Sequence, residues 1–193
     1  MSTTNPRRRD FPSPSATALA HALLDTGWHL AGAAVRVIHT AALTDDSGLT
    51  IAISSEAGRV RLDLDSEHRY LADGLSRQPW HAEATGELPV EILAAVTSAN
   101  TAASDDDPTE VTDQLTAAGW SQPHWLSRKW VSPDENREVT FNDHELENTT
   151  LPWQIRHKAG HPVTIHASAD TPAAVIAALA LTTTPAQTAI GTT

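Results

Sequence analysis

Hydrophobic and polar residues alternate most clearly at 151–181. Trp153 and Ile155 alternate with polar residues, and Val163 and Ile165 do so again after a short turn. A two-residue period of this kind predicts a pair of strands with one buried face. The turn between them contains glycine and proline, which favours a tight reversal of the chain.

A helix is predicted directly after these strands. Thr171 stands where an N-cap is expected, and Pro172 takes the first helical position. Val175, Ile176 and Leu179 then form the apolar stripe of a helix that packs onto a sheet.

Both halves of the chain are expected to contain the same order of elements. In the first half, the pattern predicts a helix at Ser13–Gly27 and a second helix from Pro89. Between them it predicts four strands, from Val35 and at Leu49–Ile53, Val60–Leu64 and Trp80–Glu83. In the second half, it predicts a helix at Asp107–Gly119 and another from Thr171. The four strands between them are expected at Trp125–Val131, Arg137–Asn142, Pro152–His157 and Val163–Ala169. Each first helix ends in a Gly-Trp pair, where glycine suits the left-handed C-cap conformation. Asn136, the equivalent of Gly58, is expected at positive φ in a turn.

These patterns predict an α+β protein of two tandem αββββα units, with antiparallel sheets each backed by helices. The expected boundaries are a disordered arm at 1–12, a first repeat at 13–100, a linker at 101–107, a second repeat at 108–182 and a disordered tail at 183–193. Whether the two sheets merge or form separate cores is left open by the pattern.

Charge and composition narrow the classes of function. The chain has 193 residues with 13 basic and 24 acidic side chains, which give a formal net charge of −11. A body this acidic repels phosphate backbones and attracts basic partners. Absence of cysteine excludes disulfides, thiolate catalysis and zinc sites built on cysteine. Because no apolar run approaches the roughly 20 residues that span a bilayer, and none resembles a secretory signal, we expect a cytoplasmic protein without membrane contact.

Several short motifs follow one another in the second half: Ala118-Gly119-Trp120, Ser132-Pro133-Asp134, Arg137, Trp153 and Thr171-Pro172-Ala173. Their order resembles that of the SPDY-type domains of actinomycetes, a family of unknown function often found in tandem copies and in integrative or plasmid-borne elements. The resemblance covers about residues 115–181 and extends weakly into the first half. It implies the fold and an actinomycete source, and it implies no activity, because the shared residues form a turn and a helix cap.

Histidines of the predicted hairpin are the first candidates for a metal site. His157 and His161 flank the turn and His166 follows on the second strand, so two imidazoles could share a metal. Asp170 is the only carboxylate close in sequence, and no cysteine is available as a ligand. Exposed polar positions on a sheet are the favoured interpretation, and no metal, cofactor or catalytic residue is predicted.

Paired charges on one strand are a second candidate. Asp63 and Asp65 share a face, as do Arg59 and Arg61. Two carboxylates at that spacing can serve acid/base chemistry or bind a cation. The alternating arginines favour a solvated strand face of mixed charge instead.

Tryptophans supply the candidate nucleic-acid site. Trp28 and Trp120, after the helix ends, are expected in the core. Trp125 and Trp130, with Arg128 and Lys129 between them, could form a stacking platform for single-stranded nucleic acid, joined by charge from the arginines at 7–9. Packing of one ring on the neighbouring half is the favoured interpretation.

No phosphate loop, nucleophile elbow or metalloprotease signature is present in the sequence. We therefore predict a non-enzymatic acidic interaction or regulatory protein with an unknown, basic protein partner. The alternative is a single-stranded nucleic-acid-binding protein whose tandem sheets are similar, by fold analogy, to those of Whirly-type proteins.

Overall fold

A computed structural model describes residues 14–31, 41–46, 48–56, 59–67, 69–70, 76–86, 88, 90–102, 109–124, 127–142, 151–159 and 162–182. The helices are α1 (Pro14–Asp25), α2 (Val90–Ala102), α3 (Thr109–Ala117) and α4 (Ala173–Leu181). The strands of the main sheet are β1 (His29–Leu30), β2 (Ala41–Thr44), β3 (Leu49–Glu56), β4 (Arg59–Ser66), β7 (Trp80–Thr85), β8 (Lys129–Val131), β9 (Arg137–Phe141), β10 (Trp153–His157) and β11 (Val163–Ala167). A separate two-stranded sheet pairs β5 (Arg69–Tyr70) with β6 (Ser76–Arg77).

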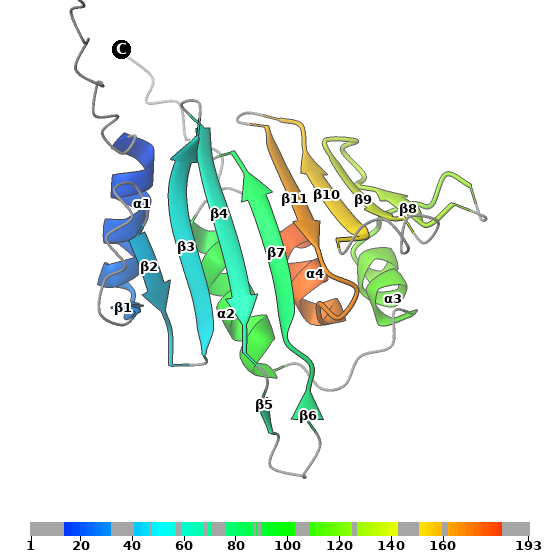
Figure 1. Cartoon of the computed structure of the whole chain (residues 1–193). Helices are drawn as coiled ribbons and strands as arrows, with labels where there is room; N and C mark the ends of the chain where they lie inside the picture. Colours follow the sequence, from blue (N-terminus) through cyan, green and yellow to red (C-terminus); the bar gives the residue numbers. More distant parts are fainter. Residues whose placement is uncertain are drawn as a thin grey trace, which may run out of the picture.

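One nine-stranded antiparallel sheet runs through the described chain in the order β1-β2-β3-β4-β7-β11-β10-β9-β8 (Figure 1). Its centre is the pairing of β7 with β11, in which Ala84 lies opposite Ile165 and Glu83 opposite His166. Strands from the two halves of the sequence are therefore joined in a single sheet, which answers the question that the pattern left open.

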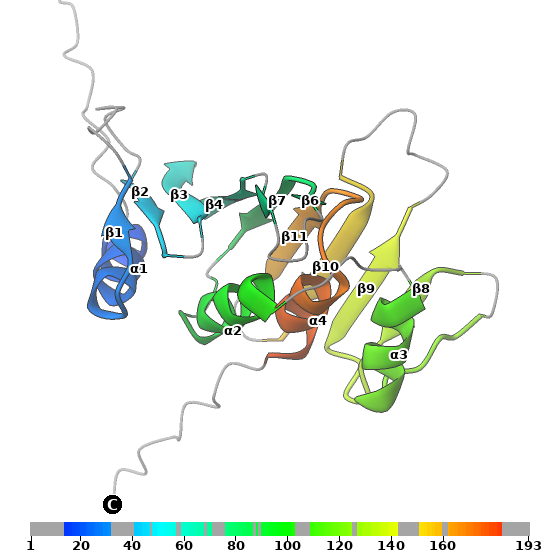
Figure 2. The same cartoon turned by 90° about the horizontal axis from the view of Figure 1, so that it is seen from below.

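All four helices lie on the same face of this sheet (Figure 2). Helix α2 packs beside α4, α3 lies on the other side of α4, and α1 covers the end formed by β1–β3. We call this side the helix face and the opposite side the open face, because no described helix or strand packs over it.

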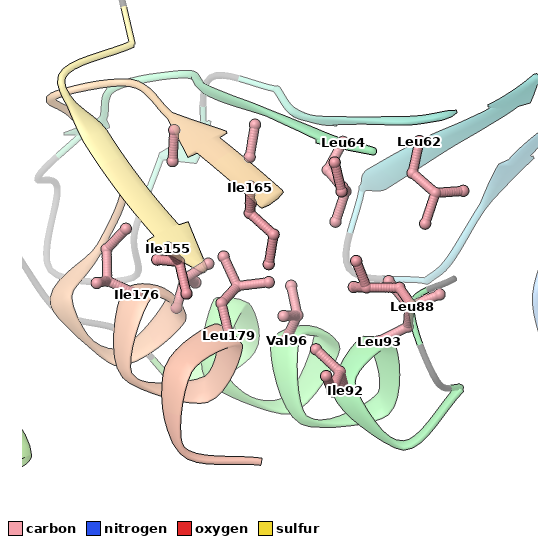
Figure 3. Packing of buried hydrophobic residues seen from close by; sticks show 14 of the residues in the cluster. Leu62, Leu64, Leu88, Ile92, Leu93, Val96, Ile155, Ile165, Ile176 and Leu179 are labelled. Atoms are coloured by element: carbon pink, nitrogen blue, oxygen red, sulfur yellow. The ribbon is translucent and has the colours of Figure 1, made fainter. Parts of the chain in front are cut away.

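The core fills the space between the sheet and the helices (Figure 3). Leu62 and Leu64 of β4 and Ile165 of β11 are fully buried against residues of α2 and α4, among them Ile92 and Leu179. Alternation explains the strand side of this core, since every second strand residue points toward the helices. The α+β class and the predicted strands at Leu49–Ile53, Val60–Leu64, Trp80–Glu83, Pro152–His157 and Val163–Ala169 are confirmed, with small shifts at their ends.

Helix ends confirm some predictions and correct others. Gly27 and Gly119 have φ of 96° and 81°, and Trp28 and Trp120 after them are buried, as predicted. Helix α4 instead begins at Ala173 with Pro172 at the cap, one residue later than expected. Because Thr171 then lies outside the helix, its hydroxyl oxygen lies 3.1 Å from that of Ser168 and caps no helical N–H group.

Turns and boundaries differ in detail. The residue at positive φ in the turn before β9 is Glu135, at 56°, and not Asn136. A strand, β2, occupies Ala41–Thr44, whereas the predicted strand from Val35 lies outside the described residues, as do the segments 1–12 and 183–193. Helix α2 continues to Ala102, into the predicted linker. No helix among the described residues is long and apolar enough to cross a membrane.

Candidate functional site

The open face carries the side chains that alternate with the core. On β4 these are the arginines and aspartates between the buried residues, and on β7 they are His81 and Glu83 between Trp80, Ala82 and Ala84. Charged side chains therefore cross the middle of the open face, where β4 pairs with β7.

Five of these residues form one connected set, which we call the carboxylate network. The Arg61 guanidinium lies 3.2 Å from Asp63 Oδ1 through Nε and 3.1 Å from Glu83 Oε2 through Nη2. The imidazole of His81 lies 2.7 Å from Asp65 Oδ1 through Nδ1 and 3.4 Å from Glu83 Oε1 through Nε2. Each carboxylate of the network thus has a cationic or imidazole partner.

Strand register explains why the network takes this form. Asp63 lies directly opposite Glu83, an arrangement that places like charges together across two strands. Arg61 bridges both and offsets their repulsion. Asp65 lies directly opposite His81, so this second contact is a direct cross-strand pair.

Protonation of His81 is coupled to the network. Partial burial lowers the pKa of His81, but hydrogen bonds and charges from Asp65 and Glu83 outweigh it and raise the pKa above its usual 6.5. A protonated His81 adds a second cation to three carboxylates.

The network could also hold a metal ion on geometric grounds, since ligand atoms of Asp63, His81 and Glu83 lie within 4.8 Å of one another. Arg61 already makes ion pairs with two of these carboxylates, so a metal would compete with the chain's own guanidinium. The sequence pattern identifies Asp63 and Asp65 as candidate site residues, whereas His81 and Glu83 are brought next to them only by the pairing of β4 with β7. Their alternation with Trp80 and Ala82 is the one local signal that could have placed them on this face.

A second charged group lies across β8, β9 and β10, and we call it the basic cluster. Glu138 Oε1 accepts hydrogen bonds from Lys158 Nζ at 2.6 Å and from Lys129 Nζ at 3.1 Å. Arg156 lies directly opposite Glu138 in the register of β9 and β10. The hydrogen bond from Lys158, reinforced by Lys129, holds the pKa of Glu138 below its usual range. Two lysines therefore share one carboxylate, and a third cation, Arg156, lies on the neighbouring strand.

The two described histidines of the hairpin, His157 and His166, lie on opposite faces of the sheet. His157 points to the helix face, where its Nε2 donates to the carbonyl oxygen of Leu179 at 2.9 Å, and burial lowers its pKa. His166 lies on the open face, with Nε2 3.4 Å from Gln154 Nε2. His161 lies outside the described residues. Because the sheet separates His157 from His166, these two side chains cannot share a metal.

The described residues of the proposed stacking platform also do not form one surface. Trp130 is only 4% exposed and packs on the helix face against Trp153, with ring centroids 6.3 Å apart. The Arg128 guanidinium lies 5.1 Å from the centre of the Phe141 ring, and Trp125 lies outside the described residues. A buried ring offers no face to a base, which weighs against the role suggested for Trp130, and the nucleic-acid hypothesis stays a prediction.

The motif residues of the second half have structural roles. Arg137 Nη1 donates to the carbonyl oxygens of Ala180 and Leu181, at 3.1 and 3.0 Å, and its guanidinium lies 5.4 Å from the centre of the Trp120 ring. It thereby stabilises the carboxyl end of α4 against the sheet. Ser132 Oγ accepts a hydrogen bond from the Arg137 backbone N–H at 2.9 Å and closes the turn before β9.

Comparisons with protein-family models, curated proteins and solved structures give no match to this chain. The resemblance to SPDY-type domains therefore stays a prediction. The geometry of the open face is the basis on which function can be argued.

Proposed function

We propose that this chain is a non-enzymatic acidic interaction protein that binds a protein partner across the open face of its sheet. One observation carries the proposal: all four helices pack on one face of a nine-stranded sheet, and no described element covers the other. Such a face offers a broad, rigid surface, because the covered side holds every strand in register.

The chemistry of the open face favours a protein over a nucleic acid. Trp28, Trp80, Trp120, Trp130 and Trp153 are buried, so none of these rings is available for base stacking. Carboxylates occupy the centre of the face and would repel a phosphate backbone. Side chains of both charges, half-exposed and held by one another, are typical of the polar part of protein interfaces.

The charges on the open face restrict which kind of protein surface can bind there. Among the described side chains, this face carries five basic residues, Arg59, Arg61, Lys129, Arg156 and Lys158, and four acidic ones, Asp63, Asp65, Glu83 and Glu138. The acidic excess of the described residues therefore lies outside this face. A partner for this face needs both signs of charge, and not the uniformly basic surface that net charge alone suggested.

Duplication accounts for the way this face is built. Strands β2-β3-β4-β7 are followed by α2, and strands β8-β9-β10-β11 by α4, so we interpret the sheet as two tandem αββββα units joined through their last strands. Membership of the SPDY-type family, an actinomycete source and a cytoplasmic location belong to the same proposal.

Photo-cross-linking of the full chain in the cells that make it tests this function. A photoreactive amino acid at Thr164, on the open face of β11, is compared with one at Ser98, an exposed position of α2. We expect protein adducts from position 164 that the control lacks and that disappear when Arg156 and Lys158 are both changed to Glu. Equal adducts from both positions, or saturable binding of single-stranded DNA in their place, would contradict the proposal.

A further inference from the structure

We infer that the partner of the open face is a second copy of this chain, in an isologous dimer whose two sheets stack face to face. The inference rests on the proposed function, which makes the open face a binding surface. It is carried by the separation of the carboxylate network and the basic cluster on that one face.

The two groups have opposite excess charge. In the carboxylate network, Asp63, Asp65 and Glu83 are matched by one guanidinium and by His81. In the basic cluster, Lys129 and Lys158 bind Glu138 and Arg156 lies opposite it, so three cations accompany one carboxylate. Arg59, exposed at the start of β4, lies outside both groups.

Strand β11 lies midway between the two groups. On one side, β7 and then β4 carry the carboxylate network, and on the other, β10 and then β9 carry most of the basic cluster. Neighbouring strands are about 4.8 Å apart, so the inner and outer strands of each group lie about 5 and 10 Å from β11. Along the strands the two groups are offset, since Glu83 lies level with His166 and Arg156 lies level with Thr164. A two-fold axis that lies between the stacked sheets and crosses β11 obliquely, between Thr164 and His166, therefore brings the carboxylate network of each copy over the basic cluster of the other.

Symmetry also restricts what can lie near the axis, because a side chain there meets its own copy. Strand β11 offers Thr164 and His166 to the open face, and neither is a carboxylate, a lysine or an arginine. Both charged contacts of the dimer are attractive, and no permanent charge is forced against itself. A second copy thus supplies the two signs of charge in the arrangement that the face requires.

Sedimentation of the full chain tests this dimer. We expect a dimer at about 50 mM salt that shifts toward monomer at about 500 mM, because salt screens exposed charge pairs. Two variants reverse one group each: R156E/K158E changes the basic cluster, and D65K/E83K changes the carboxylate network. Each variant alone should dimerise at least about tenfold more weakly, since like charges then face each other in both contacts.

Mixing the two variants gives the decisive result. One then carries acidic groups at both sites and the other basic groups, so an equimolar mixture should restore a dimer that contains one copy of each. The control E91K/D113K makes the same change in net charge as D65K/E83K, on exposed positions of α2 and α3, and should leave dimerisation unchanged. Circular dichroism confirms folding, and the milder R156Q/K158Q and D65N variants, expected to weaken the dimer less, replace any reversal that does not fold.

Failure of the dimer and failure of the proposed function are distinguishable. A wild-type chain that is monomeric at low salt, or a dimer that neither reversal weakens, overturns the inference. Cross-links from position 164 to a different protein would then leave the proposed function standing. Absence of any adduct specific to position 164, with a monomeric chain, would remove both.

Discussion

Each strand of the sheet supplies one side chain to the helix face and the next to the open face. In β7, Trp80 and Ala82 are buried under the helices, while His81 and Glu83 between them stay about one-third exposed and bind residues of β4. The helix face is thus held by burial, and the open face by charges that the register places opposite one another. Burial and charge pairing are thus contributed by alternate residues of the same strands.

Two histidines show how far the faces differ. His157, on the helix face, is largely removed from water, and burial lowers its pKa. His81, on the open face, lies between two carboxylates, which outweigh its burial and raise its pKa. The same side chain is therefore held neutral on one face and favoured as a cation on the other.

Removing a buried side chain should give the largest effect. Ile165 of β11 is fully buried, whereas Thr164 beside it points to the open face. We expect Ile165→Ala to lower the free energy of unfolding by about 2–5 kcal/mol through lost burial and the cavity left behind. Thr164→Ala should change it by less than about 0.5 kcal/mol. Urea denaturation measures both changes. Equal losses of unfolding free energy would mean that side chains on the open face contribute as much to stability as those on the helix face.

The junction of the two halves should be nearly as sensitive. Gly86 follows β7 with φ of 124°, and a Cβ added there would lie 2.6 Å from the carbonyl oxygen of Pro162. We expect Gly86→Ala to cost about 1–3 kcal/mol from the backbone conformation, with the steric clash in addition. Gly27→Ala is the matched control, since Gly27 also has positive φ but nothing within 4 Å of an added Cβ. Similar losses of unfolding free energy in the two variants would show that close packing at the junction is not important.

Local pattern was sufficient for much of the helix face. Alternation in Val60–Leu64 predicts a strand with one buried side, and this holds because side-chain direction in a strand depends only on sequence parity. Gly27 and Gly119 likewise mark helix ends, since few other residues adopt the left-handed conformation easily. The shift from Asn136 to Glu135 at positive φ shows the limit of such reasoning at one-residue precision.

The open face could be predicted only in part. Asp63 and Asp65 follow from the pattern of β4, but His81 and Glu83, which complete the carboxylate network, come from a strand about 20 residues away. Pairing of β7 with β11 links residues about 80 positions apart, and no local preference encodes it. Trp130 is buried on the helix face, in line with the favoured packing interpretation, but the pattern could not decide this because periodicity assigns a residue to one side of a strand without showing which side is covered.

Breaking the carboxylate network should give a smaller effect than either change above. Arg61→Gln leaves Asp63 and Glu83 opposite each other without their shared cation. We expect a loss of unfolding free energy below about 1 kcal/mol, because these groups are half-exposed and screened by solvent. Adding Glu83→Gln should restore most of it, whereas Arg156→Gln alone should have little effect. Urea denaturation at low salt measures the cycle, and an Arg61 loss that Glu83→Gln does not repair would show that the two residues act independently.

The two histidines should give the smallest effects, with opposite signs. A raised folded-state pKa means that His81 contributes stability below pH 6.5, and that this contribution is lost as pH rises through the folded pKa. A lowered folded-state pKa means that His157 contributes stability above pH 6.5, and that this is lost as pH falls toward the folded pKa.

Unfolding free energy measured as a function of pH separates the two residues. His81→Gln should remove a decline in stability on the alkaline side of pH 6.5, and His157→Gln should remove one on the acidic side. Because the sheet keeps the residues on opposite faces, the double variant should show the sum of the two changes. A pH profile in which both variants flatten the same side would mean that the two faces do not hold histidine in different protonation states, and the electrostatic contrast between them would be lost.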